Sequence, residues 1–97
     1  MAEIRWTEAV AGWLEEIHEY IASDNPEAAD RVAEGIYRKV QILAEFPETG
    51  HHYREEPEGA IRILLYGHYR IAYLFRRHEV VEILGIFHGA LDMQRYI

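Results

Sequence analysis

The spacing of apolar residues changes once along this chain, and that change constrains the fold more than any other feature. Up to residue 46 the apolar residues recur every three or four positions, whereas from residue 61 onward they alternate with other residues. The first spacing places apolar side chains on one face of a helix, and the second places them on one face of a strand. Helices followed by strands indicate an α+β domain.

Two amphipathic helices are expected in the first half of the chain. Thr7 is placed to cap the first, and Asn25 to cap the second, with Pro26 at its first helical position. Pro47 is expected to end the second helix just after residue 46. Because the break between the helices is so short, they must form an antiparallel hairpin. Their apolar faces consist of Val10, Trp13, Leu14, Ile17 and Ile21 in the first helix and Ala29, Val32, Ile36, Val40 and Leu43 in the second.

A short β-prone segment precedes the helices, and three strands are expected to follow them as an antiparallel meander. Gly67-His68 is the first expected turn, of type II′ because Gly occupies its first central position, and Arg77-His78 is the second. The tail after residue 89 is expected to form a helical turn or an added edge strand. The expected strands are residues 4–6, 61–66, 69–76 and 80–87.

The resulting order is β-α-α-β-β-β, with the helical hairpin packed on one face of an antiparallel sheet, in a single domain spanning residues 1–97. Residues 47–59 form a thirteen-residue connection, for which both a binding loop and a plain crossover are open. The other face of the sheet is expected to be exposed and to carry Arg62, Arg70 and Arg76.

Charge and composition exclude several functions. The net charge is −7, with fourteen acidic and five basic residues in positions 1–59 but three acidic and five basic in positions 60–97. Such a chain repels nucleic acid at long range, although its C-terminal half can present a local cationic face. The absence of Cys excludes disulfides and thiolate chemistry. With no apolar run of membrane-spanning length and no signal-peptide pattern, a cytoplasmic protein without membrane association is expected.

Two polar clusters in the connection invite functional interpretations. His51 and His52 suggest a metal site, but their spacing matches no metal-binding pattern. Glu55, Glu56 and Glu58 suggest paired carboxylates, but no acid–base partner is fixed near them by the sequence. Both clusters are typical of solvated loops, so we expect no metal site and no cofactor.

Arg62, Arg70 and His88 are the candidate catalytic residues. They lie in or end different strands, and side chains on one face of adjacent strands can converge. Arg can hold a phosphate and His can transfer a proton, which together suffice for metal-free cleavage of RNA by its own 2′-hydroxyl. The alternative is that the arginines pair with carboxylates on a solvated sheet and His88 ends a strand. The spacing alone favours this alternative.

The order of these elements and several segments resemble the RelE/ParE superfamily of type II toxin–antitoxin toxins, closest to the ParE-like (plasmid stabilisation) branch. The resemblance covers roughly residues 3–92. The matching segments are IRWTEAV, LEEIHEYIASDNPEAADRV, ILAEFPETG, YRIAYLF and VEILGIFHGALD.

This resemblance implies a small α+β toxin held inactive in a heteromeric complex by a cognate ParD-like or RelB-like antitoxin. Studied ParE-like members poison DNA gyrase, whereas RelE-like members cleave mRNA on the ribosome. Arg70 matches the family's strand arginine, His88 matches a histidine of some ribonuclease members, and Arg62 falls where several members place a basic residue.

Departures from the ribonuclease pattern favour the ParE-like branch. The segment before the meander has no Lys and is rich in Glu, and Gly89 follows His88 where some nucleases carry an aromatic residue. The expected function is therefore growth inhibition by a non-enzymatic gyrase poison. A ribosome-dependent mRNA endoribonuclease that uses Arg62, Arg70 and His88 is the alternative, and an interaction module without a toxic target is a weaker one.

Overall fold

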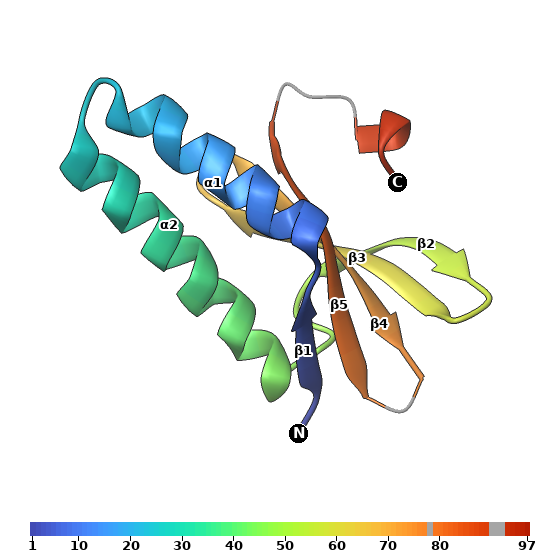
Figure 1. Ribbon diagram of the computed structural model, residues 1–97. Coiled ribbons are helices and arrows are strands. Elements are labelled where there is room, and N and C mark those ends of the chain that lie inside the picture. The colour runs from blue at the N-terminus through green and yellow to red at the C-terminus, as the bar shows by residue number, and fades with distance from the viewer. Residues whose placement is uncertain (78, 90–92) are drawn as a thin grey trace.

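Two antiparallel helices pack against a five-stranded sheet (Figure 1). The structure, a computed structural model, describes residues 1–77, 79–89 and 93–97. The 3-10 turns η1 and η2 follow the second helix and the last strand. In chain order the elements are β1 (Glu3–Trp6), α1 (Glu8–Ala22), α2 (Pro26–Gln41), η1 (Ile42–Ala44), β2 (His51–Glu56), β3 (Gly59–Tyr66), β4 (Tyr69–Arg76), β5 (Val80–His88) and η2 (Met93–Arg95).

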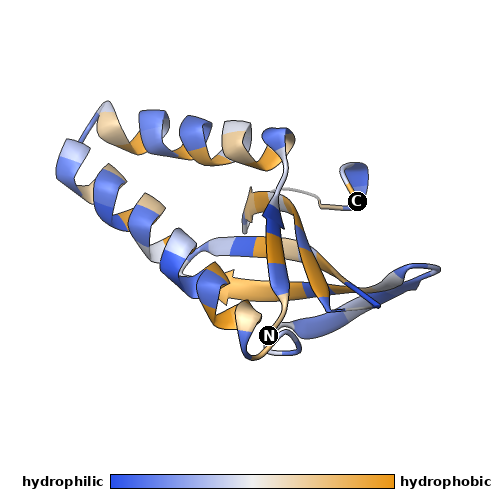
Figure 2. Cartoon of the chain, turned by 60° about the horizontal axis from the view of Figure 1, so that its bottom comes forward, coloured by the Kyte–Doolittle hydropathy of each residue, from blue (hydrophilic) through white to orange (hydrophobic). Residues whose placement is uncertain are grey.

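The expected helix caps are confirmed. The Thr7 side chain accepts a hydrogen bond from the Val10 amide at 3.2 Å, and the Asn25 side chain accepts one from the Ala28 amide at 3.1 Å. Pro26 is the first residue of α2. These side chains satisfy amides that a helix start leaves without an intrahelical partner. Figure 2 shows both helices banded with hydrophobic and hydrophilic residues, as expected of amphipathic helices.

The predicted meander of β3, β4 and β5 is confirmed, and the sheet is mixed. Its order is β1-β5-β4-β3-β2, with β1 parallel to β5 and the other neighbours antiparallel. Gly67 in the β3–β4 turn has a φ of +56°, as the first central position of a type II′ turn requires. The second predicted turn includes His78, which lies outside the described residues.

The prediction of a thirteen-residue connection at residues 47–59 is wrong, because this segment contains β2. Strand β2 pairs with β3 at the edge of the sheet, and its register shifts between His52 and Arg54. Most of its side chains are exposed. An edge strand of this kind is polar on both faces, so it lacks the apolar alternation by which the other strands were recognised.

A core fills the space between the helices and the sheet. Val10, Ile36 and Val40 from the helices are fully buried there, as are Tyr73 and Ile83 from the sheet. Gly35 of α2 allows an especially close approach, because a Cβ atom at this position would lie 1.8 Å from the Tyr66 hydroxyl. Tyr66 therefore packs against α2.

The sheet face opposite the helices is not fully exposed, contrary to expectation. Ile63, Ala72 and Phe87 are buried on this outer face beneath Met93, and Ile97 packs beside them. The expected helical turn of the tail is present as η2, while residues 90–92 lie outside the described part of the chain. Within the described ranges, no helix is both long enough and apolar enough to cross a membrane.

Candidate functional site

Arg70 and His88, two of the candidate catalytic residues, lie on opposite faces of the sheet. In the β4–β5 register, His88 is opposite Tyr69 and Arg70 is opposite Phe87. Tyr69 packs against the core beneath the helices, whereas Phe87 belongs to the outer-face cluster. Because successive side chains of a strand point to opposite faces, Arg70 faces outward and His88 faces the helices. The predicted convergence of these two residues is therefore wrong.

A β-bulge in β5 explains the error. Tyr73 pairs with Ile83 and Ala72 pairs with Gly85, which leaves Leu84 as an extra residue. One extra residue reverses the facing of every residue after it. Strict alternation along β5 would have placed His88 on the same face as Arg70.

His88 contributes to a groove between α1 and the ends of β4 and β5. The groove has a volume of about 350 Å³ and is lined by both helix and sheet residues. The His88 ring makes an edge contact with Tyr69 at a centroid distance of 5.7 Å, and the His68 ring lies 6.3 Å away. The lining residues are Trp13, Glu16, Ile17, Tyr20, Tyr69, Ile86 and His88.

Arg70 lies beside the outer-face cluster. Its Nη2 donates to the Gly89 carbonyl at 3.3 Å, and its cross-strand neighbours are Leu65 and Phe87. The Phe87 ring in turn contacts Trp13 at 4.8 Å and Tyr96 at 5.5 Å. Of the three candidate catalytic residues, Arg70 is therefore the one that lies on the outer face, near its apolar cluster.

Arg62 has a structural role, and it lies on the face opposite to the one expected. It pairs with the buried Tyr73 in the β3–β4 register, and its Nη1 donates to the carbonyls of Glu48 at 3.1 Å and Gly50 at 2.6 Å. The Tyr73 hydroxyl donates to the Pro47 carbonyl at 2.7 Å and accepts from the Gly50 amide at 2.9 Å. Burial raises the pKa of this hydroxyl. Arg62 and Tyr73 together hold the loop that precedes β2.

Arg76 lies on the outer face as expected, within a row of alternating charges. Its Nη2 is 3.3 Å from a Glu82 carboxylate oxygen on β5. On β1, the hydrogen bond from Arg5 to Glu3 raises the pKa of Arg5, and Glu82 adds to this effect. This end of the outer face is therefore charge-balanced, as the alternative interpretation of the arginines expects.

The two polar clusters of residues 47–59 lie along β2 and the turn that follows it. The His52 Nε2 atom is 3.4 Å from Glu55, and Arg54 is 2.7 Å from Glu56, in both cases between exposed or half-exposed side chains. In the ranges that the structure describes, no three His, Asp or Glu side chains are arranged to hold a metal ion.

A second groove, on the helical hairpin, was not predicted from the sequence. It has a volume of about 410 Å³, and its lining is almost entirely apolar. Trp6 and Tyr37 stack at one end with ring centroids 5.8 Å apart. The helical spacing of Ala11, Leu14 and His18, and of Ala33 and Tyr37, is the signal that could have revealed it. The groove is lined by Trp6, Ala11, Leu14, Glu15, His18, Ala33 and Tyr37.

Comparison with known proteins now assigns the chain to a family. The model of the family described as the ParE toxin of the type II toxin–antitoxin system parDE matches residues 4–93. The chain belongs to this family. The ParE-like branch suggested by the sequence is thereby confirmed, and the chain is a toxin of the type II toxin–antitoxin class.

Two individual proteins are similar to this ParE-family toxin. "Putative toxin Y4kP" from Sinorhizobium fredii (strain NBRC 101917 / NGR234) is 39% identical over 86 residues, which cover 89% of this chain and 86% of that protein. A solved chain of the chromosomal ParDE toxin–antitoxin system from P. aeruginosa has the same fold. Its TM-score is 0.72 at 22% identity, covering 91% of this toxin and 96% of that chain.

Proposed function

We propose that this ParE-family toxin inhibits growth in the cytoplasm by binding DNA gyrase, without catalysing a reaction of its own. We propose further that an antitoxin encoded beside it neutralises it in a heteromeric complex. The observation that carries the non-enzymatic proposal is the register of β4 and β5, in which Arg70 and His88 face opposite sides of the sheet.

The separation of these residues argues against RNA cleavage because both groups must act on one phosphate. A general acid or base has to reach its proton at hydrogen-bond distance, and a cation has to contact the same reacting group. Arg62, the third candidate, is engaged with the carbonyls of Glu48 and Gly50. The net charge of −7 also opposes docking onto ribosomal RNA.

A gyrase assay with purified components tests the proposal. Addition of the toxin to DNA gyrase and relaxed plasmid is expected to block supercoiling or to accumulate cleaved DNA, and prior addition of the antitoxin is expected to prevent this. The His88→Ala variant is expected to inhibit as the unmodified toxin does. A toxin that leaves both gyrase reactions unchanged contradicts the proposal.

Mapping of RNA ends in cells distinguishes the ribonuclease alternative. Induction of a ribonuclease creates new mRNA ends in translating cells, and loss of its proton-transfer residue reduces them by about 10²–10⁴-fold. A gyrase poison is expected to give DNA-damage signalling without such ends. New ends that disappear in the His88→Ala variant would replace our proposal with the ribonuclease.

A further inference from the structure

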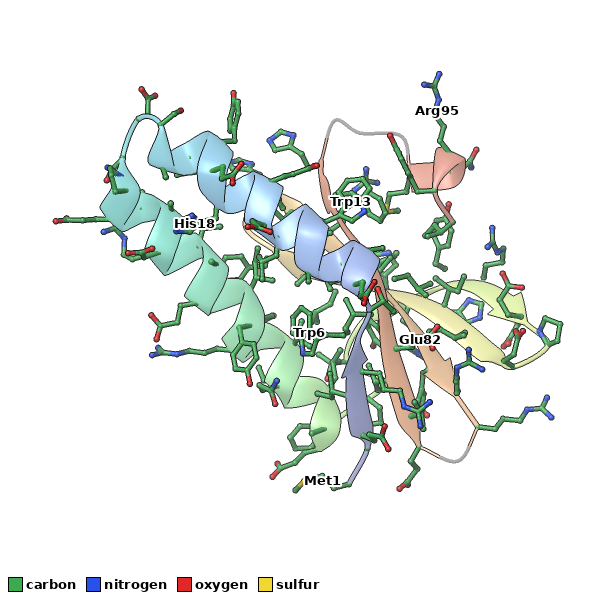
Figure 3. All side chains as sticks on the ribbon, viewed as in Figure 1. Met1, Trp6, Trp13, His18, Glu82 and Arg95 are labelled. Atoms are coloured by element: carbon green, nitrogen blue, oxygen red, sulfur yellow. The ribbon has the colours of Figure 1, made fainter. Side chains whose placement is uncertain are left out.

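The groove between α1 and the ends of β4 and β5 has aromatic residues on both of its walls. Helix α1 contributes four of the lining residues, and their offsets of three, four and seven positions place them on one face of the helix. Figure 3 shows Trp13 on the side of α1 away from Trp6 and His18, so this groove is separate from the one between the helices. The α1 wall consists of Trp13, Glu16, Ile17 and Tyr20, and the sheet wall of Tyr69, Ile86 and His88.

Two of the aromatic rings in this groove are held in place before any ligand arrives. The Trp13 ring contacts the Phe87 ring edge-on with centroids 4.8 Å apart, and the Tyr69 ring contacts the His88 ring edge-on at 5.7 Å. Burial raises the pKa of Tyr69 and Tyr20 raises it further, so the hydroxyls of Tyr20 and Tyr69 lie close enough to interact across the groove. Walls that are already ordered reduce the entropy cost of binding.

The groove combines an apolar floor with an exposed rim. Ile86 is fully buried and Trp13 and Tyr69 are half-buried, whereas Glu16 and Tyr20 are exposed. Its volume of about 350 Å³ lies at the lower end of the roughly 300–1,000 Å³ that is typical of small-molecule sites. A ligand can therefore bury an apolar group against the floor while its charge stays near the rim.

The charge at the rim of the groove selects a cation. Within residues 1–77, 79–89 and 93–97, the Glu16 carboxylate forms no ion pair. Helix α1 carries four carboxylates and neither Lys nor Arg, so an anionic ligand is repelled by it. Aromatic rings attract a cation over their faces, and this attraction grows when the cation is desolvated. An unpaired carboxylate beside Trp13, Tyr20 and Tyr69 therefore favours an organic cation.

We propose that this groove binds the quaternary ammonium group of a small molecule. A primary ammonium brings three N–H donors and a guanidinium five, and a predominantly apolar lining leaves most of them without partners. A quaternary ammonium has no N–H donors, so it does not incur this cost. The methyl groups of the ligand pack between Trp13 and Tyr69, and its positive charge lies near Glu16. This ligand site is independent of gyrase inhibition and of neutralisation by an antitoxin.

Choline and its neutral analogue 3,3-dimethyl-1-butanol, in which a tert-butyl group replaces the trimethylammonium group, test the proposal. The titration is made at about pH 8, where imidazole side chains are neutral. In proton–nitrogen correlation spectra of the full chain, choline is expected to shift the indole N–H signal of Trp13 but not that of Trp6, which lines the groove between the helices. We expect saturation with a Kd on the order of 1 mM. The neutral analogue is expected to bind at least about tenfold more weakly, because it lacks the charge.

Glu16→Gln and Glu15→Gln isolate the contribution of the rim charge. Both variants remove one negative charge from α1, but Glu16 lines this groove and Glu15 lines the groove between the helices. Glu16→Gln is expected to weaken choline binding by about threefold to tenfold, and Glu15→Gln to change it by less than about twofold. Raised sodium chloride is expected to narrow the difference, because Glu16 is exposed.

Tyr20→Leu and Tyr37→Leu test the aromatic wall without a change of charge. Both tyrosines are exposed, Tyr20 at 81% and Tyr37 at 52%, so neither variant opens the core. Tyr20→Leu is expected to weaken choline binding by about two- to fivefold, because a cation–π contact is lost. Tyr37 lines the groove between the helices, so Tyr37→Leu is expected to leave choline binding unchanged. Thermal melting verifies that both variants fold.

Several results would overturn the proposal. Absence of a saturable shift of the Trp13 signal excludes the site, and equal binding of choline and its neutral analogue reduces it to an apolar groove. Equal choline affinities of Glu16→Gln and Glu15→Gln place the ligand elsewhere. Tighter binding of methylguanidinium than of choline replaces the small molecule with an Arg side chain of a partner protein. A negative gyrase or antitoxin assay leaves the choline titration unaffected, so failure of this site and failure of the proposed function are distinguishable.

Discussion

Arg62 and Tyr73 face each other across β3 and β4, and each holds a different part of the loop before β2. Arg62 donates to two carbonyls, while the Tyr73 hydroxyl both donates to Pro47 and accepts from Gly50. Gly50 is a shared partner, since its carbonyl binds Arg62 and its amide binds Tyr73. A residue that resembled a catalytic arginine in the sequence thus has a structural explanation.

Removal of the Tyr73 hydroxyl is expected to destabilise the toxin. In Tyr73→Phe, the Gly50 amide and the Pro47 carbonyl lose a buried partner, at a cost of about 1–3 kcal/mol in the free energy of unfolding. Urea denaturation measures this change. The control is Tyr20→Phe, because Tyr20 is 81% exposed. Equal stability of the two variants would contradict the role assigned to the Tyr73 hydroxyl.

The shared partner predicts coupling between Arg62 and Tyr73. Arg62→Met removes the two carbonyl contacts but keeps most of the side-chain volume. Because both residues bind Gly50, the double variant with Tyr73→Phe is expected to lose less stability than the sum of the single losses, by about 0.5–3 kcal/mol. A double-mutant cycle of unfolding free energies measures this coupling energy between Arg62 and Tyr73. Strict additivity would show that the two side chains act independently.

Two helix glycines are expected to respond oppositely to substitution by Ala. Gly12 of α1 has no atom within 4 Å of an added Cβ, so Gly12→Ala is expected to raise the unfolding free energy by about 0.5–1 kcal/mol. In Gly35→Ala, the added methyl group meets the Tyr66 hydroxyl, and overpacking of this kind costs about 1–3 kcal/mol. Thermal or urea unfolding checks both values. Stabilisation by Gly35→Ala would contradict the close packing of Tyr66 on α2.

Alkaline pH is expected to destabilise the toxin through the buried Tyr73 and the partly buried Tyr69. Burial raises the pKa of Tyr73 and of Tyr69 above the ordinary value of 10.0. The folded state therefore retains these protons more tightly than the unfolded state. The resulting stability is fully present below pH 10 and is lost as the pH rises through the folded-state pKa values. Ultraviolet titration of tyrosinate, with Tyr73→Phe as the control, should show one late transition fewer in the variant.

The aromatic contacts of the C-terminal segment predict a fluorescence change. Tyr96 contacts Trp13 at 5.1 Å and Phe87 at 5.5 Å, and aromatic pairs contribute about 0.5–1.5 kcal/mol each beyond their buried area. In a Trp6→Phe background, where Trp13 is the remaining tryptophan, Tyr96→Ala is expected to shift the emission to longer wavelength and to lower stability. Unchanged emission would contradict the packing of this segment over the outer face.

The helices and the central strands could be predicted because their local sequence signals agree with the overall fold. Thr7, Asn25 and Pro26 mark helix starts, and the apolar spacing marks which faces are buried. Strand β2 could not be predicted from that spacing, because an edge strand with exposed side chains has no apolar face to reveal it.

The candidate site was mispredicted for a different reason. Side chains along β5 alternate between the two faces of the sheet from Val81 to Ile83, and the extra residue Leu84 then reverses this alternation. A bulge depends on the local backbone path and on the partner strand, which periodicity does not report. Arg70 was correctly placed in a strand and His88 at the end of one, but this did not fix the side of the sheet on which each lies. The groove between the helices was missed because the small and apolar residues that line it also read as ordinary packing positions.

The single surplus residue Leu84 in β5 determines on which side of the molecule the His88 side chain lies. In a relative whose final strand runs without that surplus, a histidine at the matching place would stand beside the strand arginine instead of beneath α1. Two relatives with the same residues at the positions of Arg70 and His88 can therefore differ in whether the imidazole and the guanidinium lie on the same face of the sheet. Before the activities of two relatives are compared, the number of residues between the positions of Ile83 and Gly85 should be established for each.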